Sequence, residues 1–281
     1  MSQIDQYLQD LQDYSIMPFA IPILLGLAGL EFYISRRKNL KVYDTKDAKA
    51  ASIIGLINVG LGLLLKTINF TFLLFFYTLI PWRIEASWWS FILCFTTVDF
   101  MRYWAHRIAH EKRLWWATHV THHSSKQFNF TVAFRLGWTQ NLKIVFFVPI
   151  MLAGFDPIVF FICHQVAVLY QFWIHSPFIK KLWRPIEFLL VTPSHHRVHH
   201  GTNPEYIDKN YGSTFIIWDR VLGTFAPETG PVVYGITKPL AQPYNPVYLV
   251  FHEWKDLLHD VVRCSSLKMA WKVMFSAPGS E

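Results

Sequence analysis

Long apolar runs separated by short polar connections dominate the first two thirds of the chain and predict membrane-spanning helices. Residues 16–34 are long enough to cross a bilayer, which takes about 20 apolar residues in a helix. Residues 51–82 form a second run, interrupted only by Lys66. A continuous helix over this run would be about 48 Å long, too long for one upright span. We therefore expect it to tilt strongly or to break near Lys66, and to end at Pro81.

Four more apolar runs follow along the chain. Residues 88–104 carry aromatic residues at both ends, as spans do where they meet the membrane interface. The runs 142–154 and 157–174 flank a GFDP turn and are short enough to form a hairpin rather than two full spans. In residues 249–274 the apolar positions repeat with helical spacing and have basic neighbours. This pattern predicts one amphipathic helix, which either lies on the membrane surface or packs on the preceding domain.

Composition and charge support a membrane protein. Of the 281 residues 52% are hydrophobic and only 16% are charged, whereas soluble domains usually carry about a quarter charged residues. The net charge of +7 comes from short basic runs beside apolar segments, which is typical of cytoplasmic loops rather than of nucleic-acid binding. The basic run RRKNLK after the first span places that end in the cytosol. The three cysteines lie far apart and predict neither a disulfide framework nor a cysteine zinc site.

Histidines gather in the segments AHRIAHE, THVTHHSS and TPSHHRVHH. Spacings of three and four residues place side chains on one helical face, so each segment can direct several imidazoles at one point. Scattered histidines would be surface or capping residues, but clusters of this ligand type predict a metal site. The clustered histidines are His106, His110, His119, His122, His123, His195, His196, His199 and His200.

The other histidines receive separate interpretations. His175 ends the run 157–174, and counting spans places it on the cytosolic side with His106, so we expect it to be a ligand. His164 lies in the middle of that run and is expected to be a core residue. His252 and His259 are expected to face solvent.

Asp99 and Arg102 lie within the run 88–104, where ionisable residues are costly and are suspected of a function. One interpretation pairs Asp99 with Arg102, three residues later. In the other, Asp99 lies on the helical face of His106 and orients that imidazole through its second nitrogen.

The number of histidines restricts the metal chemistry. Zinc uses three or four ligands and haem one or two, and the sequence has neither HExxH nor the Glu-x-x-His pairs of soluble di-iron bundles. A histidine-rich dinuclear centre of iron remains, with copper as the second candidate. Such a centre at a membrane surface suits oxygen activation on a lipid. The rival interpretation is a metal transporter, but transporters place polar ligands near the bilayer midplane.

The ordered motifs HRIAH, HVTHH and HHRVHH, with NYG after them, resemble the fatty acid hydroxylase/sterol desaturase superfamily of membrane di-iron enzymes. Longer blocks such as DFMRYWAHRIAHE and TPSHHRVHHGTNPEYIDKNYG are similar to its members that hydroxylate glyceryl ether lipids. The resemblance implies two iron ions, a lipid substrate from the bilayer, no nucleic acid, and tetrahydrobiopterin or a redox protein as external electron donor. Sterol or fatty-acyl hydroxylation or desaturation is the alternative activity.

The resemblance also implies residue roles. Asp99 and Glu111 match polar catalytic positions, while His195, Asn210 and Tyr211 match positions beside the ligands. The implied metal ligands are His106, His110, His119, His122, His123, His175, His196, His199 and His200.

The predicted fold is an all-α, multi-span integral membrane protein with a histidine-rich helical catalytic cap on the cytosolic face. Residues 1–85 are expected to form N-terminal membrane segments. Residues 86–240 would be the fatty acid hydroxylase-type catalytic domain, and residues 241–281 an amphipathic tail.

Overall fold

Helices make up the regular structure of residues 3–279, the part of the chain that the computed structural model describes. Within that part no strand forms, only isolated β-bridges, so the all-α prediction is confirmed. Residues 1–2 and 280–281, at the outer ends of the first and last predicted segments, lie outside the described residues. The helices are α1 Gln3–Asp13, α2 Met17–Arg37, α3 Thr45–Thr78, α4 Trp88–Glu111, α5 Arg113–Trp116, α6 Val120–His123, α7 Phe130–Phe134, the 3₁₀ helix η1 Gln140–Phe147, α8 Val148–Leu152, α9 Pro157–Trp173, α10 Arg184–Leu189, α11 Pro193–His199, α12 Ile217–Val221, α13 Pro246–Val262 and α14 Leu267–Phe275.

Within residues 3–279, two stretches are long and apolar enough to cross a membrane, Asp5–Arg37 and Thr45–Thr78. Many of their large apolar side chains are exposed, among them Phe19, Leu56 and Leu63. A core helix of a soluble protein would bury these side chains, because large exposed apolar surfaces are rare outside interfaces and membranes. The exposure therefore indicates a membrane protein.

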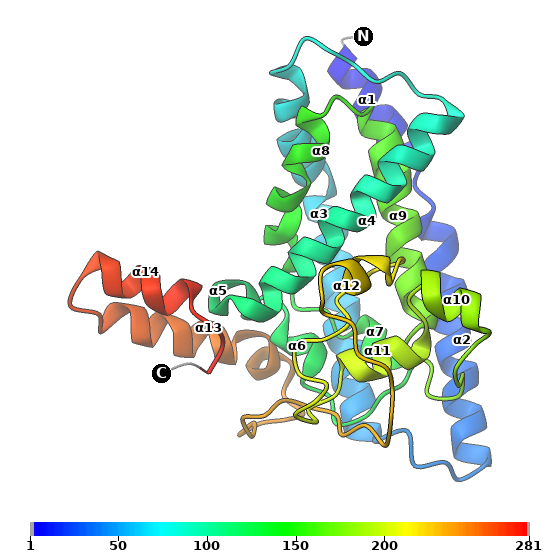
Figure 1. Ribbon diagram of the computed structural model, residues 1–281, viewed down its shortest axis with the longest axis vertical. Helices are drawn as coiled ribbons and strands as arrows, with labels where there is room; N and C mark the ends of the chain where they lie inside the picture. The colour runs from blue at the N-terminus through cyan, green and yellow to red at the C-terminus, as the bar shows by residue number, and fades with distance from the viewer. Residues whose placement is uncertain (1–2, 280–281) are drawn as a thin grey trace.

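Helix α3 continues without interruption through Lys66, which rules out the second of the two alternatives, a break near this residue. The Lys66 ammonium donates a hydrogen bond to the carbonyl of Leu11 at 2.8 Å and lies 5.1 Å from the ring centroid of Phe161. Because α1 and α9 provide these partners, the helix can carry the charge without unwinding. At 34 residues, α3 is about 51 Å long and runs along much of the molecule (Figure 1).

Helix α4 packs along α9 and extends past the predicted end of its apolar run to Glu111. Ser87 begins α4 with a capping box. The runs around the GFDP turn form the expected hairpin, in which η1 and α8 lead back into α9 (Figure 1). Gly154 adopts φ +92° in that turn, a conformation that favours glycine, and Asp156 caps α9.

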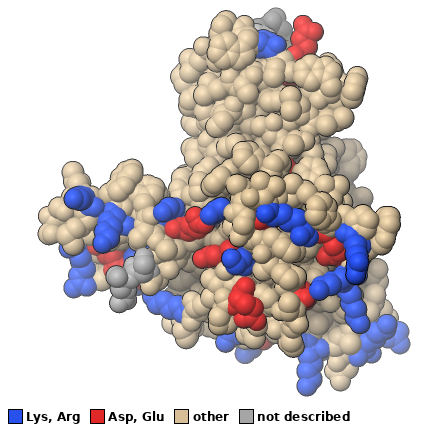
Figure 2. Space-filling view, viewed as in Figure 1, with Lys and Arg blue, Asp and Glu red and all other residues tan. Residues whose placement is uncertain are grey.

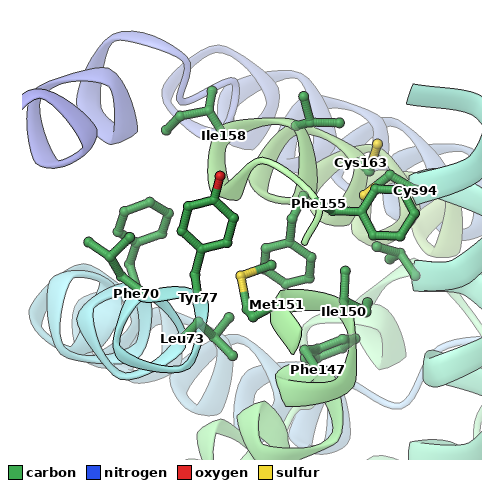
Figure 3. Packing of buried hydrophobic residues seen from close by; sticks show 14 of the residues in the cluster. Phe70, Leu73, Tyr77, Cys94, Phe147, Ile150, Met151, Phe155, Ile158 and Cys163 are labelled. Atoms are coloured by element: carbon green, nitrogen blue, oxygen red, sulfur yellow. The ribbon is translucent and has the colours of Figure 1, made fainter. Parts of the chain in front are cut away.

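A hydrophobic core joins α3, α4, α8 and α9 in the half of the molecule away from the histidines (Figure 3). On the face shown in Figure 2, this half is almost free of charged side chains, apart from a few at its far end. Lys, Arg, Asp and Glu gather instead across the middle and the lower half. Core residues include Phe70, Leu73, Tyr77, Cys94, Phe147, Ile150, Met151, Phe155, Ile158 and Cys163.

The C-terminal segment forms two helices, so the prediction of one helix over residues 249–274 is wrong. Helix α13 ends at Val262, and Ser266 caps the start of α14. His252 is buried and its Nδ1 lies 3.1 Å from the carbonyl of Tyr248, which corrects its predicted solvent exposure. His259 is exposed, as expected.

Helix α13 packs on α3, α5 and α6, as one of the two alternatives predicts. The second helix, α14, has no buried residue and projects with α13 as a lateral arm (Figure 1).

Candidate metal centre

Nine buried or nearly buried histidines converge in two adjoining groups. Within each group the candidate ligand atoms all lie within 4.8 Å of one another. These nine are the positions that the superfamily resemblance implies as ligands. The first group is His106, His110, His119, His123 and His199; the second is His122, His175, His196 and His200.

Helical spacing explains why each segment contributes neighbouring rings. His106 and His110 lie one turn apart at the polar end of α4, and His196 and His200 lie one turn apart on α11 and its C-cap. His199, the residue before His200, faces the first group instead. The segment from α11 therefore serves both groups and links them.

The rings approach each other through their Nε2 atoms. In the first group, His119 Nε2 lies 2.9 Å from His106 Nε2 and 3.3 Å from His123 Nε2. In the second, His196 Nε2 lies 3.0 Å from His175 Nε2 and 3.1 Å from His200 Nε2. Each group thus aims several Nε2 atoms at one small volume.

Backbone carbonyls determine which nitrogen carries the proton in three of the rings. His106 Nδ1 lies 2.8 Å from Tyr211 O, His175 Nδ1 2.8 Å from Gln171 O, and His199 Nδ1 3.0 Å from Lys209 O. A carbonyl only accepts, so Nδ1 must donate and a neutral ring keeps its lone pair on Nε2. The carbonyls therefore leave Nε2 lone pairs directed into both groups.

The donor set fits metal ions. Lone pairs that face one another repel unless a proton or a cation lies between them. In addition, the Nε2 atoms of His110 and His199 are buried without a hydrogen-bond partner, although such atoms are normally satisfied. Cations at the two group centres would satisfy both requirements.

Burial keeps these imidazoles neutral, which is the ligand form. It lowers the pKa of His119, His123 and His199 in the first group well below the ordinary value, and neighbouring histidine charges lower it further. In the second group burial has the same effect on the pKa of His196 and His200. The rings are thus available to a metal at neutral pH.

Asn210 and Tyr211 lie next to the histidine groups. Asn210 adopts φ +56° and its side chain donates to the carbonyls of His195 and Ala226, at 3.2 and 2.8 Å. These bonds tie the loop to α11. The carbonyl of Tyr211 faces His106, so this loop sets the orientation of a candidate ligand.

Asp219 holds the same loop, and the sequence interpretation did not identify it. Its carboxylate accepts from the backbone N–H groups of Tyr211 and Gly212 and from Thr224 Oγ1, each at 2.7 Å. Burial raises the pKa of this carboxyl. A single acidic residue within the apolar block IIWDRVLGTF was the available signal.

Asp99 makes neither of its two predicted contacts. It accepts hydrogen bonds from the backbone N–H groups of Thr214 and Phe215, at 2.7 and 3.1 Å, and from the indole of Trp218 at 2.9 Å. The expected bond to His106 is wrong because the Tyr211 carbonyl occupies the second nitrogen of that ring.

Arg102, the other predicted partner of Asp99, is engaged elsewhere. Its guanidinium donates to Ser213 Oγ at 2.7 Å and to the side chain of Gln171. Asp99 therefore anchors the loop that follows Tyr211 to α4, rather than neutralising Arg102 through a direct ion pair.

The remaining candidates lie outside both groups. Glu111 pairs with Arg107 at 2.7 Å at the protein surface. His195 Nε2 lies 3.1 Å from Glu187, on the other side of α11 from the groups. His164 packs against the ring of Phe147, as its prediction as a core residue requires.

Comparison with known proteins identifies the relatives of this chain. Residues 91–224 match the fatty acid hydroxylase family. The chain is 39% identical to an alkylglycerol monooxygenase of Danio rerio over 273 residues, and 36% identical to one of Homo sapiens over 281 residues. An ornithine lipid hydroxylase of Rhizobium tropici is 31% identical over 166 residues, 55% of this chain and 50% of that protein. No solved structure matches the chain.

The likeness to the two monooxygenases covers 92% and 98% of this chain, which spans 59% and 61% of their lengths. All nine histidines of the two groups fall within the matched residues 91–224. The resemblance that the histidine motifs predict is confirmed: the chain carries a fatty acid hydroxylase domain and is related to the alkylglycerol monooxygenases.

Proposed function

We propose that the protein is a membrane di-iron monooxygenase that hydroxylates a lipid with O₂, and that its substrate is an ether lipid. The observation that carries this proposal is the pair of histidine groups, each with four or five buried imidazoles whose ligand atoms lie within 4.8 Å of one another. The named activity of the relatives from Danio rerio and Homo sapiens supports the choice of an ether lipid.

Two groups imply two ions, because nine ligands exceed one coordination sphere. Imidazole suits iron, and iron supplies the oxygen chemistry when it is bound. The net reaction inserts one atom of O₂ into a C–H bond and releases the other as water. It consumes two electrons and two protons from an external reductant, either tetrahydrobiopterin or a redox protein.

The residues of the chain hold the ligands and exclude water. Carbonyls of Gln171, Lys209 and Tyr211 would keep three rings in the metal-binding tautomer. Asp219 and Asp99 would act indirectly, by fixing the loop that supplies the Tyr211 carbonyl. Glu111, paired with Arg107 at the surface end of α4, would relay protons toward the first group, and Asp208, whose Oδ1 lies 3.6 Å from His110 Nδ1, is a second carboxylate beside that group.

We further propose a multi-span topology with the histidine groups on the cytosolic face, and residues 86–240 as the catalytic domain. The basic end of α2 and the histidine-bearing helices α6 and α11 lie in the same half of the molecule (Figure 1), where charges gather on the face shown in Figure 2. Lipid would enter from the bilayer beside α4 and α9. The positive-inside rule supports the cytosolic assignment of this half.

Metal analysis and turnover of the detergent-purified protein test the proposal. We expect two iron ions per chain, and oxidation of a 1-O-alkylglycerol in the presence of O₂ and either tetrahydrobiopterin or a reduced ferredoxin. An acyl ornithine lipid and a sterol serve as competing substrates. One equivalent of zinc without iron would refute the di-iron proposal. Oxidation of only the sterol or the acyl lipid would refute the choice of substrate.

A further inference from the structure

The loop of residues 208–211, with the sequence DKNY, borders the first histidine group. Its carbonyls at positions 209 and 211 accept hydrogen bonds from the Nδ1 atoms of His199 and His106, at 3.0 and 2.8 Å. Two left-handed residues alternate with these carbonyls, Asp208 at φ +59° and Asn210 at φ +56°. Asp and Asn adopt this conformation more readily than other residues except glycine. The loop is therefore built to present acceptors to the rings.

Asp208 gives the same loop a third contact with the first group. Its Oδ1 lies 3.6 Å from His110 Nδ1, while His110 Nε2 is buried without a hydrogen-bond partner. The Asp208 side chain is 54% exposed, so it has room for the small rotation that shortens this contact into a hydrogen bond. A carboxylate only accepts, so it favours a proton on Nδ1 and leaves the Nε2 lone pair for a metal.

The second group has fewer partners of this kind. Gln171 O accepts from His175 Nδ1 at 2.8 Å, but the Nδ1 atoms of His122 and His196 are buried without a hydrogen-bond partner. When Nε2 of either ring binds a metal, its Nδ1 carries a buried N–H that nothing accepts, which is costly. Within residues 3–279, no carboxylate lies at ion-pair distance from a ring of this group. The two groups therefore differ in the support that their ligands receive.

We propose that the loop 208–211 makes the first group the tighter of the two metal sites, and that Asp208 positions His110 for the ion held there. The inference rests on the proposed di-iron function and deepens it, because it separates a retained ion from an exchangeable one. A partner on the second nitrogen of a ligand typically contributes about 10–100-fold in metal affinity. The carboxylate also compensates part of the positive charge that neutral rings leave on an ion.

Iron release from the purified, full-length, iron-loaded protein tests this difference. Under anaerobic, reducing conditions, an excess of the iron(II) chelator ferrozine should remove the ions in two phases of equal amplitude, with rates at least about tenfold apart. Asp208→Asn should accelerate the slow phase about tenfold, the lower range for a lost ligand partner, and leave the fast phase unchanged. Asparagine tolerates the left-handed conformation of residue 208, so the backbone of the loop is kept.

Two further variants establish that the position of this carboxylate is the cause. Asp208→Gly removes the whole side chain and keeps φ +59°, which glycine adopts freely, so it should accelerate the slow phase at least as much as Asp208→Asn. Glu205→Gln removes the same charge from an exposed residue three positions earlier and should change neither phase. A residue that only held the fold together would accelerate both phases.

Release of both ions at one rate would overturn the inference, and so would acceleration of both phases in Asp208→Asn or an equal effect of Glu205→Gln. Release does not depend on turnover, which separates the inference from the proposed function. If the protein oxidises no ether lipid, the proposed substrate fails, while two phases with a selective effect of Asp208→Asn still support the inference. An active protein that releases its iron in one phase would keep the proposed function and overturn the inference.

Discussion

Adjacent histidines in the segment TPSHHRVHH have different surroundings. His196 Nε2 faces His175 and His200, whereas His195 Nε2 faces Glu187. Successive residues on a helix point about 100° apart, so only one member of a pair can face a given centre. The spacing of the motif predicted a metal site, but which way each ring faces depends on tertiary contacts, those of His196 with His175 and of His195 with Glu187.

His196→Ala and His195→Ala form a matched pair at this position. We expect His196→Ala to lose most of its iron and its turnover, because it removes a ring from the second group. His195→Ala should keep its iron and lose at most about tenfold in activity, the lower range for a residue that supports a ligand. Iron content and turnover of the purified variants check this. Equal iron loss in both would show that α11 presents both rings to the metals.

Asp99 gives a second prediction at this scale. Asp99→Asn puts an amide N–H₂ against backbone N–H donors, so at least one of the three hydrogen bonds is lost. An unsatisfied buried group costs about 1–3 kcal/mol. We therefore expect a lower Tm and weaker iron retention, transmitted through the loop to His106.

Two further variants decide the cause of that defect. Trp218→Phe removes one donor to Asp99 and should give a smaller change in the same direction. Arg102→Gln should not rescue Asp99→Asn, since Arg102 donates to Ser213 and Gln171 instead. If Arg102→Gln restored the Tm and the iron retention of Asp99→Asn in full, Asp99 and Arg102 would form an ion pair, which would contradict the structure.

At the scale of helices, hydropathy predicted which segments are helical but not where each helix ends. Helix α4 continues past its apolar run because its polar last turns pack against the histidine segments. A search for repeating apolar positions does not detect such polar turns. The continuity of α3 depends on Leu11, 55 residues away from Lys66. The break before α14 had a local signal, the serine pair at 265–266, which suits a helix start.

The lateral arm of α13 and α14 supports a prediction about the membrane surface. On α14, Leu267 and Trp271 are 91% and 63% exposed, and Lys268 and Lys272 lie beside them. An exposed apolar face with basic neighbours suits the interface of an anionic bilayer. We therefore expect α14 to lie on the membrane surface.

A nitroxide attached at Trp271→Cys tests the membrane contact of α14 in nanodiscs that contain anionic lipid. Oxygen, which concentrates in the bilayer, should increase the relaxation rate of this nitroxide more than a water-soluble nickel chelate does. A nitroxide at Glu205→Cys, on an exposed loop near the histidines, should show the opposite preference. If the nickel chelate relaxed the nitroxide at residue 271 more than oxygen did, another protein surface, or none, would cover α14.

At the scale of the whole molecule, the fold separates an apolar half from a half that carries most of the charges on the face shown in Figure 2 and the histidine-bearing helices α6 and α11 (Figure 1). The sequence predicted this division, because apolar runs and histidine clusters alternate in a readable order. It could not predict the groups that act through backbone atoms or across long separations, such as the Lys209 carbonyl and the Asp219 carboxylate. Those depend on how the loop after α11 folds back on α4.

The same division predicts the orientation of the protein in the membrane. Lys126 is exposed just after α6, and Glu85 is exposed in the connection between α3 and α4. Helix α6 and this connection lie toward opposite ends of the molecule (Figure 1). In a Cys264→Ser background, Lys126→Cys in intact cells should react only with a thiol reagent that crosses the membrane. The basic end of α2 lies in the half that carries Lys126, and basic segments stay in the cytosol. Glu85→Cys is the matched control at the other end and should react with an impermeant reagent. Labelling of Lys126→Cys by the impermeant reagent would indicate the opposite topology, with the histidine groups outside the cytosol.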